Sequence, residues 1–393
     1  MRDEMKKVPR LRFRGFQEDW ELCKFEKLTD FFSGLTYSPD NVQKDGTFVL
    51  RSSNVKDNAI VSADNVYVRN EVANSEHVQV GDVIVVVRNG SRSLIGKHAP
   101  INREMPNTVI GAFMTGLRSP SPKFLKALLD TQQFNVEIHK NLGATINQIT
   151  TGEFKRMHFT VPTDEDEKEK IGSLFRQLDD IIALHQRKLD QLKELKKAYL
   201  QVMFPAKDER VPKLRFADFE GEWEQCKLED LANKYNNLRI PITASKRIYG
   251  NTPYYGANGI QDFVEGYTHD GEFILVAEDG ASNLKDYPVQ YVNGKVWVNN
   301  HAHVLQAKRS KADNKFLMNA IKSINIEPFL VGGGRSKLNS EVMMNLEINT
   351  PSKDEQLKIS TLCKQLDDIT ALYQNKLNQL KNLKKSYLQN MFI

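Results

Sequence analysis

Several loops of the chain carry arginine, asparagine and lysine together with serine and glycine, a mixture suited to contacting nucleic acid. Residues 51–56 (Arg-Ser-Ser-Asn-Val-Lys) and 88–92 (Arg-Asn-Gly-Ser-Arg) each follow an apolar, strand-like run. Arginine matches the acceptors of guanine and asparagine matches adenine, whereas lysine, serine and glycine-exposed amides suit phosphates. Each loop taken singly is equally compatible with an ordinary polar surface. The predicted DNA-contacting residues are Arg51, Ser52, Ser53, Asn54, Lys56, Arg88, Asn89, Ser91, Arg92, Lys97, Tyr254, Tyr255, Asn258, Asn283, Lys285, Asn299, Asn300, His301, Arg335 and Lys337.

Motifs that would carry catalysis are incomplete. Residues 251–254 (Asn-Thr-Pro-Tyr) resemble the base-holding loop of amino-methyltransferases, but no glycine-rich cofactor turn stands upstream. Residues 331–337 lack the spacing of a phosphate-binding P-loop. His301 and His303 alternate as in a strand, with no third metal ligand nearby. We therefore predict no catalytic residue, no metal ion and no cofactor.

Composition places the chain among ordinary soluble proteins. Its 393 residues are 40% hydrophobic and 27% charged, with a net charge of +5, and this length favours two or three domains. No run is long and apolar enough to span a membrane, and the first twenty residues lack a secretory apolar core. We therefore expect a cytoplasmic protein that does not associate with membranes. Three widely spaced cysteines exclude a disulfide framework and favour packing roles.

The sequence contains an internal duplication. Residues 8–28 return as residues 211–231, and residues 171–204 return ungapped as residues 359–392 with 23 of 34 positions identical. Between these blocks, residues 30–160 and 234–350 share little beyond a common exit, a Gly/Ser/Thr-rich loop followed by a strand-like run and proline. The offset falls from 203 to 188, so the second insert is shorter. A shared frame with two unlike inserts predicts that the inserts hold the specificity.

Apolar residues in residues 171–204 recur every three or four positions, which predicts a helix about 50 Å long, and residues 359–392 repeat it. Thr163 and Ser352 offer hydroxyl caps. Each stripe could serve a long core helix, but two copies in one chain favour an antiparallel coiled coil. We expect the Asp pairs at 179–180 and 367–368 to be solvated. The inserts read as mixed α/β, with strands predicted at 47–51, 82–88, 273–277 and 295–298 and helices near 122–135 and 315–323.

Taken in their order along the chain, and with the long helix present in two copies, the motifs resemble those of the specificity subunit of type I restriction-modification enzymes. They are LRSSNVKDN (50–58), PYYGANG (253–259), WVNNHAHVL (297–305) and the QLDDI-containing helix with its copy. The resemblance covers essentially the whole chain. It implies two mixed α/β target-recognition domains, each reading half of a bipartite site in double-stranded DNA, and helical regions that dock two modification subunits. Methylation, S-adenosylmethionine binding, ATP-driven translocation and cleavage would belong to partner chains, including the restriction subunits.

This resemblance implies four regions. They are a first recognition domain (1–161), a central helical region (162–204), a second recognition domain with its linker (205–350) and a C-terminal helical region (351–393). Two other functions stay open on the residues alone. A self-sufficient DNA methyltransferase would bind S-adenosylmethionine by itself, and a coiled-coil assembly protein would show no salt-sensitive, sequence-dependent DNA affinity.

Overall fold

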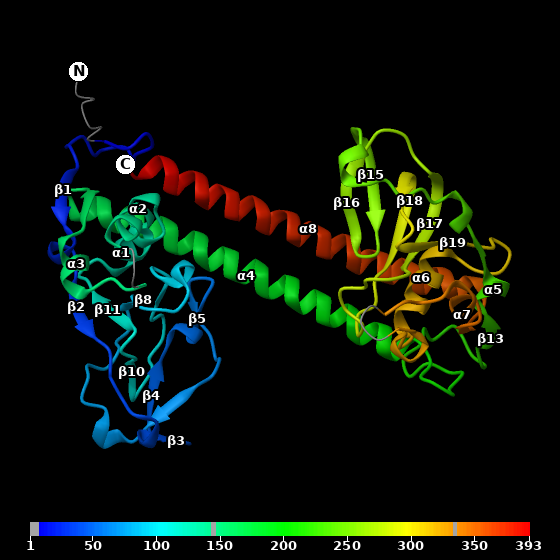
Figure 1. The fold of residues 1–393 in the computed structure, drawn as a ribbon, viewed down its shortest axis with the longest axis horizontal. Helices are drawn as coiled ribbons and strands as arrows, with labels where there is room; N and C mark the ends of the chain where they lie inside the picture. The colour runs from blue at the N-terminus through cyan, green and yellow to red at the C-terminus, as the bar shows by residue number, and fades with distance from the viewer. Residues whose placement is uncertain (1–7, 143–146, 333–335) are drawn as a thin grey trace. The chain divides into compact units, whose positions relative to one another are not determined.

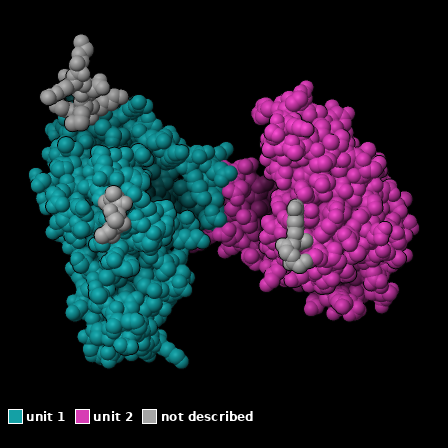
Figure 2. Space-filling model, viewed as in Figure 1, with its two compact units in different colours: residues 1–186, 376–393 teal, residues 187–375 magenta. Residues whose placement is uncertain are grey.

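The structure, a computed structural model, describes residues 8–142, 147–332 and 336–393 and divides into two units. Unit 1 comprises residues 1–186 and 376–393, and unit 2 comprises residues 187–375 (Figures 1 and 2). Each unit is a mixed α/β body that contains one of the two unlike inserts and part of each long helix. No helix in the described ranges is long and apolar enough to cross a membrane.

Unit 1 is built on two four-stranded sheets. One is antiparallel, with the order β2 (Asp30–Ser33), β11 (Met114–Arg118), β8 (Val83–Val86) and β9 (His98–Pro100). The other is mixed, with the order β10 (Thr108–Ile110), β4 (Thr47–Leu50), β7 (Val66–Val68) and β3 (Val42–Gln43). All four residues of β8 are buried, as its unbroken apolar run requires. The strands predicted at 47–51 and 82–88 are thereby confirmed.

Three helices accompany these sheets, α1 (Pro122–Leu129), α2 (Gln132–Asn141) and α3 (Thr151–Arg156), beside a small hairpin of β5 (Val55–Lys56) and β6 (Ala59–Ile60). The single helix predicted near 122–135 is in fact two helices. Thr131 is the reason, because its hydroxyl accepts a hydrogen bond from the Phe134 amide at 3.3 Å and so begins a new helix.

Unit 2 contains one six-stranded sheet with helices packed beside it. The strand order is β14 (Ala232–Lys234), β19 (Ala302–Ala307), β17 (His269–Ala277), β18 (Val289–Val298), β15 (Tyr249–Gly256) and β16 (Gly259–Val264). The helices are α5 (Leu228–Leu231), α6 (Asn314–Ser323) and α7 (Ser340–Met344). The strands predicted at 273–277 and 295–298 and the helix predicted near 315–323 are confirmed as parts of β17, β18 and α6.

The duplicated N-terminal segments form the same two-stranded sheet in each unit. β1 (Glu21–Lys24) pairs with β12 (His158–Val161), and β13 (Glu224–Lys227) pairs with β20 (Glu347–Thr350). Cys23 and Cys226 stand at equivalent positions of these pairs and form no disulfide. Burial raises the pKa of the third thiol, Cys363, to about 11. The described cysteines therefore act as small packing residues, as predicted.

The two repeated stripes form α4 (Glu165–Met203) and α8 (Lys353–Met391), each a single helix of 39 residues. Ser352 caps α8, because its hydroxyl accepts a hydrogen bond from the Glu355 amide at 3.5 Å. The hydroxyl cap predicted for α4 is wrong. There the Asp164 carboxylate accepts from the Asp166 amide at 2.7 Å, since the first copy has one extra residue before its helix.

Both units show that the helices run antiparallel. In unit 1 Asp179 contacts Lys384 at 2.5 Å, and in unit 2 Asp367 contacts Lys196 at 2.5 Å. The two ion pairs are copies of one another, because both residues of each pair are shifted by 188. The expectation of solvated Asp pairs is wrong for Asp179, which is half-buried between Lys126 and Lys384, but it is confirmed for Asp367 and Asp368, which are exposed. It also holds for Asp180, whose side chain is 75% exposed.

A repeated aromatic cluster joins each N-terminal segment to the helix pair. Trp20 packs edge-on against Phe392 with ring centroids 6.0 Å apart, and Phe124 of α1 stacks on the same ring at 5.8 Å. In unit 2 Trp223 and Phe316 of α6 pack on Phe204 at 5.9 and 5.6 Å. Since the rings have equivalent partners, Phe124 and Phe316 mark corresponding positions of α1 and α6.

Repeated polar contacts fix the same junction. Arg12 holds the fully buried Glu167 side chain at 2.7 Å, and Arg215 holds Glu355 at 2.8 Å. The hydrogen bond that Arg12 donates to the Glu167 carboxylate raises the pKa of Arg12 above its ordinary value. A charge of this kind is stable inside a protein only with its partner. The duplicated sequence thus builds the same frame twice.

Candidate nucleic-acid interface

Two of the predicted loops of unit 1 meet at one groove. The groove has a volume of about 760 Å³, and Arg51, Ser52, Ser53 and Asn89 all line it. The Asn89 amide donates a hydrogen bond to the Ser52 hydroxyl at 3.1 Å and so joins the loop after β4 to the loop after β8. The structure therefore brings together residues separated by almost forty positions in the sequence.

An exposed aromatic residue beside this groove was missed by the sequence analysis. Phe113 lines the groove, is 50% exposed, and carries the Arg88 guanidinium above its ring at 5.0 Å. Exposed aromatic rings and arginine planes are the groups on which nucleic-acid bases stack. Phe113 precedes a short strand without a basic or glycine-rich motif, so no sequence signal singled it out.

The remaining predicted residues of unit 1 divide by exposure. Asn54 is fully buried, and its amide donates to the carbonyls of Val61 and Ala63 at 3.2 and 2.7 Å. Asn54 thus shapes its loop and offers no group to a ligand. Six of the predicted residues are exposed to solvent in the loops around β5 and after β8: Ser53, Lys56, Arg88, Ser91, Arg92 and Lys97.

The predicted loops of unit 2 also converge, at the end of β17. The Asn258 side chain donates to the Gly280 carbonyl at 2.9 Å and accepts from the Ser282 amide at 2.8 Å. Nearby, the side-chain oxygen of Asn283 accepts a hydrogen bond from the backbone amide of exposed Lys285 at 3.0 Å. These bonds attach the turn between β15 and β16 to the loop that follows β17.

The turn between β18 and β19 joins the same cluster. The Glu278 amide donates to the His301 carbonyl at 2.8 Å, and the His301 ring contacts Asp279 at 2.5 Å. Lys337 reaches this cluster by an ion pair with Glu278 at 2.9 Å, and Asn300 is exposed beside it. Arg335 lies outside the described residues.

Glu278 is the electrostatic centre of that cluster. Burial raises its pKa, but hydrogen bonds from Arg239 and Lys337 lower it by more, so the pKa lies below its ordinary value. His303 is buried, and burial lowers its pKa. Within the described ranges no group of three or more His, Cys, Asp or Glu residues could hold a metal ion.

Two further predicted residues of unit 2 are structural. Tyr254 is buried, and its hydroxyl accepts from the Ile242 amide at 3.0 Å. Asn299 is buried and caps its own turn by accepting from the His301 amide at 2.8 Å. Tyr255 is half-buried in the neighbouring strand position. Tyr254 and Asn299 therefore position the loops that carry the exposed groups.

The two loop clusters occupy corresponding places in the two units. In unit 1 the amide of Ile149 donates to the Val87 carbonyl at 2.9 Å, and in unit 2 the amide of Leu338 donates to the Glu278 carbonyl at 2.7 Å. Ile149 and Leu338 belong to the common exit of the two inserts. The loop after β8 and the loop after β17 are thus equivalent, although their sequences are unrelated.

The chain belongs to the family described as type I restriction modification DNA specificity domain, whose model matches residues 17–194 and 220–382. One curated relative is the putative type I restriction enzyme specificity subunit S.HindORF215P of Haemophilus influenzae, 46% identical over 39% of this chain and 38% of its own length. A second is the StySPI specificity subunit of Salmonella potsdam, 22% identical over 95% of this chain and 89% of its own length. The chain therefore spans well under half of the first relative and most of the second.

Solved structures show the same fold. The S subunit of a type I restriction-modification system from M. genitalium matches with a TM-score of 0.71 at 15% identity, covering 98% of this chain and 99% of that one. A second match is a chain from a structure of a type I R-M system that concerns complex assembly and conformational transition. Its TM-score is 0.51 at 13% identity, and the match covers 95% of this chain and 97% of that one. The predicted fold class, two mixed α/β units with two long antiparallel helices, is confirmed.

Proposed function

We propose that this chain is the specificity subunit of a type I restriction-modification complex and reads an asymmetric, bipartite site in double-stranded DNA. The observation that carries the proposal is the frame built twice around two unlike loop clusters at equivalent positions. A frame that is repeated presents its inserts to equivalent stretches of a duplex. Inserts that differ in sequence and fold then read different bases.

The regions follow from this proposal. Residues 1–161 and 205–350 form the two recognition domains, and residues 162–204 and 351–393 form the helical regions. In unit 1 the DNA-contacting residues are the exposed or groove-lining ones, Arg51, Ser52, Ser53, Lys56, Arg88, Asn89, Ser91, Arg92 and Lys97, with Phe113 added. In unit 2 they are Asn258, Asn283, Lys285, Asn300, His301 and Lys337, with Tyr255 at their edge and Arg335 proposed from the sequence.

A second stripe on each long helix supports docking of two copies of one partner. Five exposed positions at alternating spacings of three and four are identical in both copies: Ile181, Leu184, Lys188, Gln191 and Leu195 in α4, and Ile369, Leu372, Lys376, Gln379 and Leu383 in α8. At the exposed positions 187, 190, 194 and 198 every residue differs from its counterpart. Exposed apolar side chains kept in both copies indicate a bound partner.

The partner proposed for these stripes is the modification subunit, with the restriction subunits joining through the complex. We place catalysis on those partners and assign no catalytic residue, metal or cofactor to this chain. The complex acts on chromosomal DNA, which places the chain in the cytoplasm. Methyl transfer or DNA cleavage by the isolated chain would contradict this assignment.

Exchange of one insert tests the proposal. Residues 30–160 are replaced by the corresponding insert of another family member, and the methylated sequence of the assembled complex is determined across a genome. One half-site should change while the other keeps its bases. A change in both halves would show that the inserts do not read independently, and a complex without any sequence-dependent methylation would exclude a specificity role.

A further inference from the structure

A cavity in unit 2 contains more positive than negative charge. It has a volume of about 440 Å³ and lies between α6, β18 and the two long helices. Four lysines and two aspartates line it: Lys196, Lys315, Lys322, Lys364, Asp367 and Asp368. Lys196 pairs with Asp367 and Lys364 pairs with Asp368, both at 2.5 Å. Lys315 and Lys322 make no ion pair with any residue that the structure describes.

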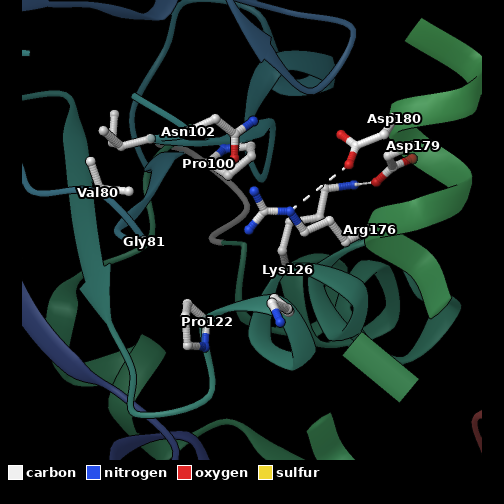
Figure 3. A pocket seen from close by; sticks show the side chains of 11 residues that line it. Val80, Gly81, Pro100, Asn102, Pro122, Lys126, Arg176, Asp179 and Asp180 are labelled. Atoms are coloured by element: carbon white, nitrogen blue, oxygen red, sulfur yellow. Dashed lines mark hydrogen bonds and ion pairs between the residues drawn. The ribbon is translucent and has the colours of Figure 1, made fainter. Parts of the chain in front are cut away.

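Unit 1 shows what the same place looks like when its charges are balanced. Since Phe124 corresponds to Phe316, Lys123 corresponds to Lys315 and Asp130 to Lys322. Lys123 pairs with Glu169 at 2.5 Å, and Asp130 pairs with Lys126 and Lys384 at 2.5 and 2.6 Å. Figure 3 shows the corresponding cavity of unit 1, where Lys126 points to Asp179. That cavity has a volume of only about 100 Å³.

Both carboxylates of unit 1 are missing from unit 2. Glu169 of α4 corresponds to Leu357 of α8, and Asp130 is replaced by Lys322. The Lys322 side chain is half-buried and the Lys315 ammonium lies over the ring of Tyr291 at 5.0 Å. Leaving a partly desolvated ammonium unpaired is costly, because neither water nor a counter-ion fully stabilises its charge. Unit 2 therefore lacks an anion that unit 1 supplies from its own chain.

We propose that the cavity lined by Lys315, Lys322, Lys196 and Lys364 binds a small phosphate-bearing anion, either inorganic phosphate or the phosphoryl group of a small metabolite. The charge count fits this class, because four lysines less two aspartates leave +2, and a phosphoryl group carries about −1.5 to −2 at neutral pH. Lysines bind phosphate as point charges. Asn319 also lines the cavity, and its buried side-chain oxygen accepts no hydrogen bond from any residue that the structure describes.

Other groups around the cavity agree with the proposal. Burial and the charge of Lys196 lower the pKa of Lys322, and Asp286 and Asp367 only partly offset this. Glu272 and Asp313 lie near Tyr291, the residue whose ring the Lys315 ammonium covers, and burial raises the pKa of Tyr291 to about 12. A bound dianion would stabilise the charged form of Lys322. None of the residues that line the cavity is a proposed DNA contact, although Asp286 belongs to the loop that follows β17 and donates its amide to the Asn283 side chain at 3.2 Å.

Isothermal titration of the full-length chain with inorganic phosphate tests this site. One phosphate should bind per chain, and Lys322→Asp, which installs the carboxylate of unit 1, should weaken binding at least tenfold. Lys322→Met removes the charge alone and should also weaken it. The matched control is Lys246→Asp, an exposed lysine of unit 2 that does not line the cavity; its affinity should stay within twofold.

Thermal unfolding of each variant shows whether it folds. Lys322→Asp should be at least as stable as the parent chain, because the new carboxylate pairs with Lys196. Absence of phosphate binding, or equal binding by the parent and both Lys322 variants, would overturn the proposal. A third titration uses the chain saturated with duplex DNA. Full displacement of phosphate by DNA would also contradict a small-anion site, since it would identify the cavity as a contact for the DNA backbone.

Discussion

Asp130 is buried in unit 1 with its side chain only 4% exposed, and its oxygens contact His98, Lys126 and Lys384. Burial raises the pKa of Asp130, but the hydrogen bond from His98 and the charges of both lysines lower it by more. Because the folded-state pKa is lowered, the carboxylate stabilises the fold above its unfolded pKa of about 3.9. That stabilisation is lost as the pH falls through the folded pKa.

Asp130→Asn should therefore destabilise unit 1 by about 3–5 kcal/mol at pH 7, because two ammonium groups lose their counter-ion. Urea unfolding at pH 7 and again below pH 4 measures the effect, and the difference from the parent chain should shrink at the lower pH. Asp180→Asn is the control, since Asp180 is largely exposed on α4. An equal penalty at both pH values would mean that packing, and not charge, is lost.

Arg88, beside the unit 1 groove, is the side chain of unit 1 that we expect to read a base. It is exposed and its guanidinium lies over Phe113. In the assembled complex, Arg88→Ala should weaken binding to the cognate site about tenfold and relax the preference at one base position. Competition binding with single-base variants of the site measures this, with exposed Arg103→Ala as control. Uniform weakening across all sequences with a shallower salt dependence would instead make Arg88 a phosphate contact.

At this scale the sequence predicts residue types better than residue roles. Ser52, Ser53 and Asn89 can be grouped from the composition of their loops, and all three line the same groove. Asn54 and Asn299 have the same local composition but turn inward, because their amides satisfy backbone groups of their own loops. Whether an asparagine side chain faces a ligand or bonds to the backbone of its own loop depends on how the rest of the chain packs over it. A short sequence motif does not determine that packing.

Among the elements, the sequence predicts both long helices and places their C-terminal ends to within one residue, but α4 and α8 each begin six residues before the predicted stripe. Their repeat of apolar positions is sustained and their first turns are acidic, so helix type and extent follow from local pattern. Which apolar residues are buried against the rest of the chain does not follow from the local pattern. Ile181 and Leu195 lie in the predicted stripe, yet both are exposed. Heptad spacing cannot distinguish apolar positions that pack within the chain from apolar positions that stay exposed and could bind another chain.

Introducing negative charge into the exposed apolar stripe tests its role in assembly. Ile181→Asp combined with Ile369→Asp should abolish binding of both modification subunits, because each aspartate would be buried in an apolar contact. Size-exclusion chromatography with light scattering measures the stoichiometry. Arg187→Asp with Asn375→Asp is the matched control on the neighbouring exposed stripe, where binding should be unchanged. Normal assembly of the Ile181/Ile369 variant would remove the stripe from the docking surface.

For the whole molecule, α4 and α8 each begin in one unit and end in the other. If the helices set the gap between half-sites, four added residues in each should lengthen it by about 6 Å. The insertions lie between Leu184 and Leu195 and between Leu372 and Leu383. With ~3.4 Å per base pair, the unread spacer in the methylated sequence should widen by one or two base pairs, with the same bases read.

An assembly assay is the control for this insertion, since partner binding also uses the helices. A complex that assembles and methylates with the original spacer would show that the helices do not set the distance. The duplication itself could be found by comparing the sequence with itself. The matching of Asp130 with Lys322 is harder to find, because α1 and α6 share only the triplet Lys-Phe-Leu (residues 123–125 and 315–317), and the equivalent ring contacts of Phe124 and Phe316 are what give that triplet meaning.

The packing of Phe392 into unit 1 has a consequence for the order in which the chain folds during synthesis. Phe392 and Met391 belong to the buried core that also contains Trp20 and Phe124. Unit 2 must therefore leave the ribosome before that core can close, an interval on the order of 10–40 s at about 5–20 residues per second. During this time Trp20 and Phe124 lack their contacts with the Phe392 ring. Unit 1 is therefore the first unit to be synthesised and the last to complete its core.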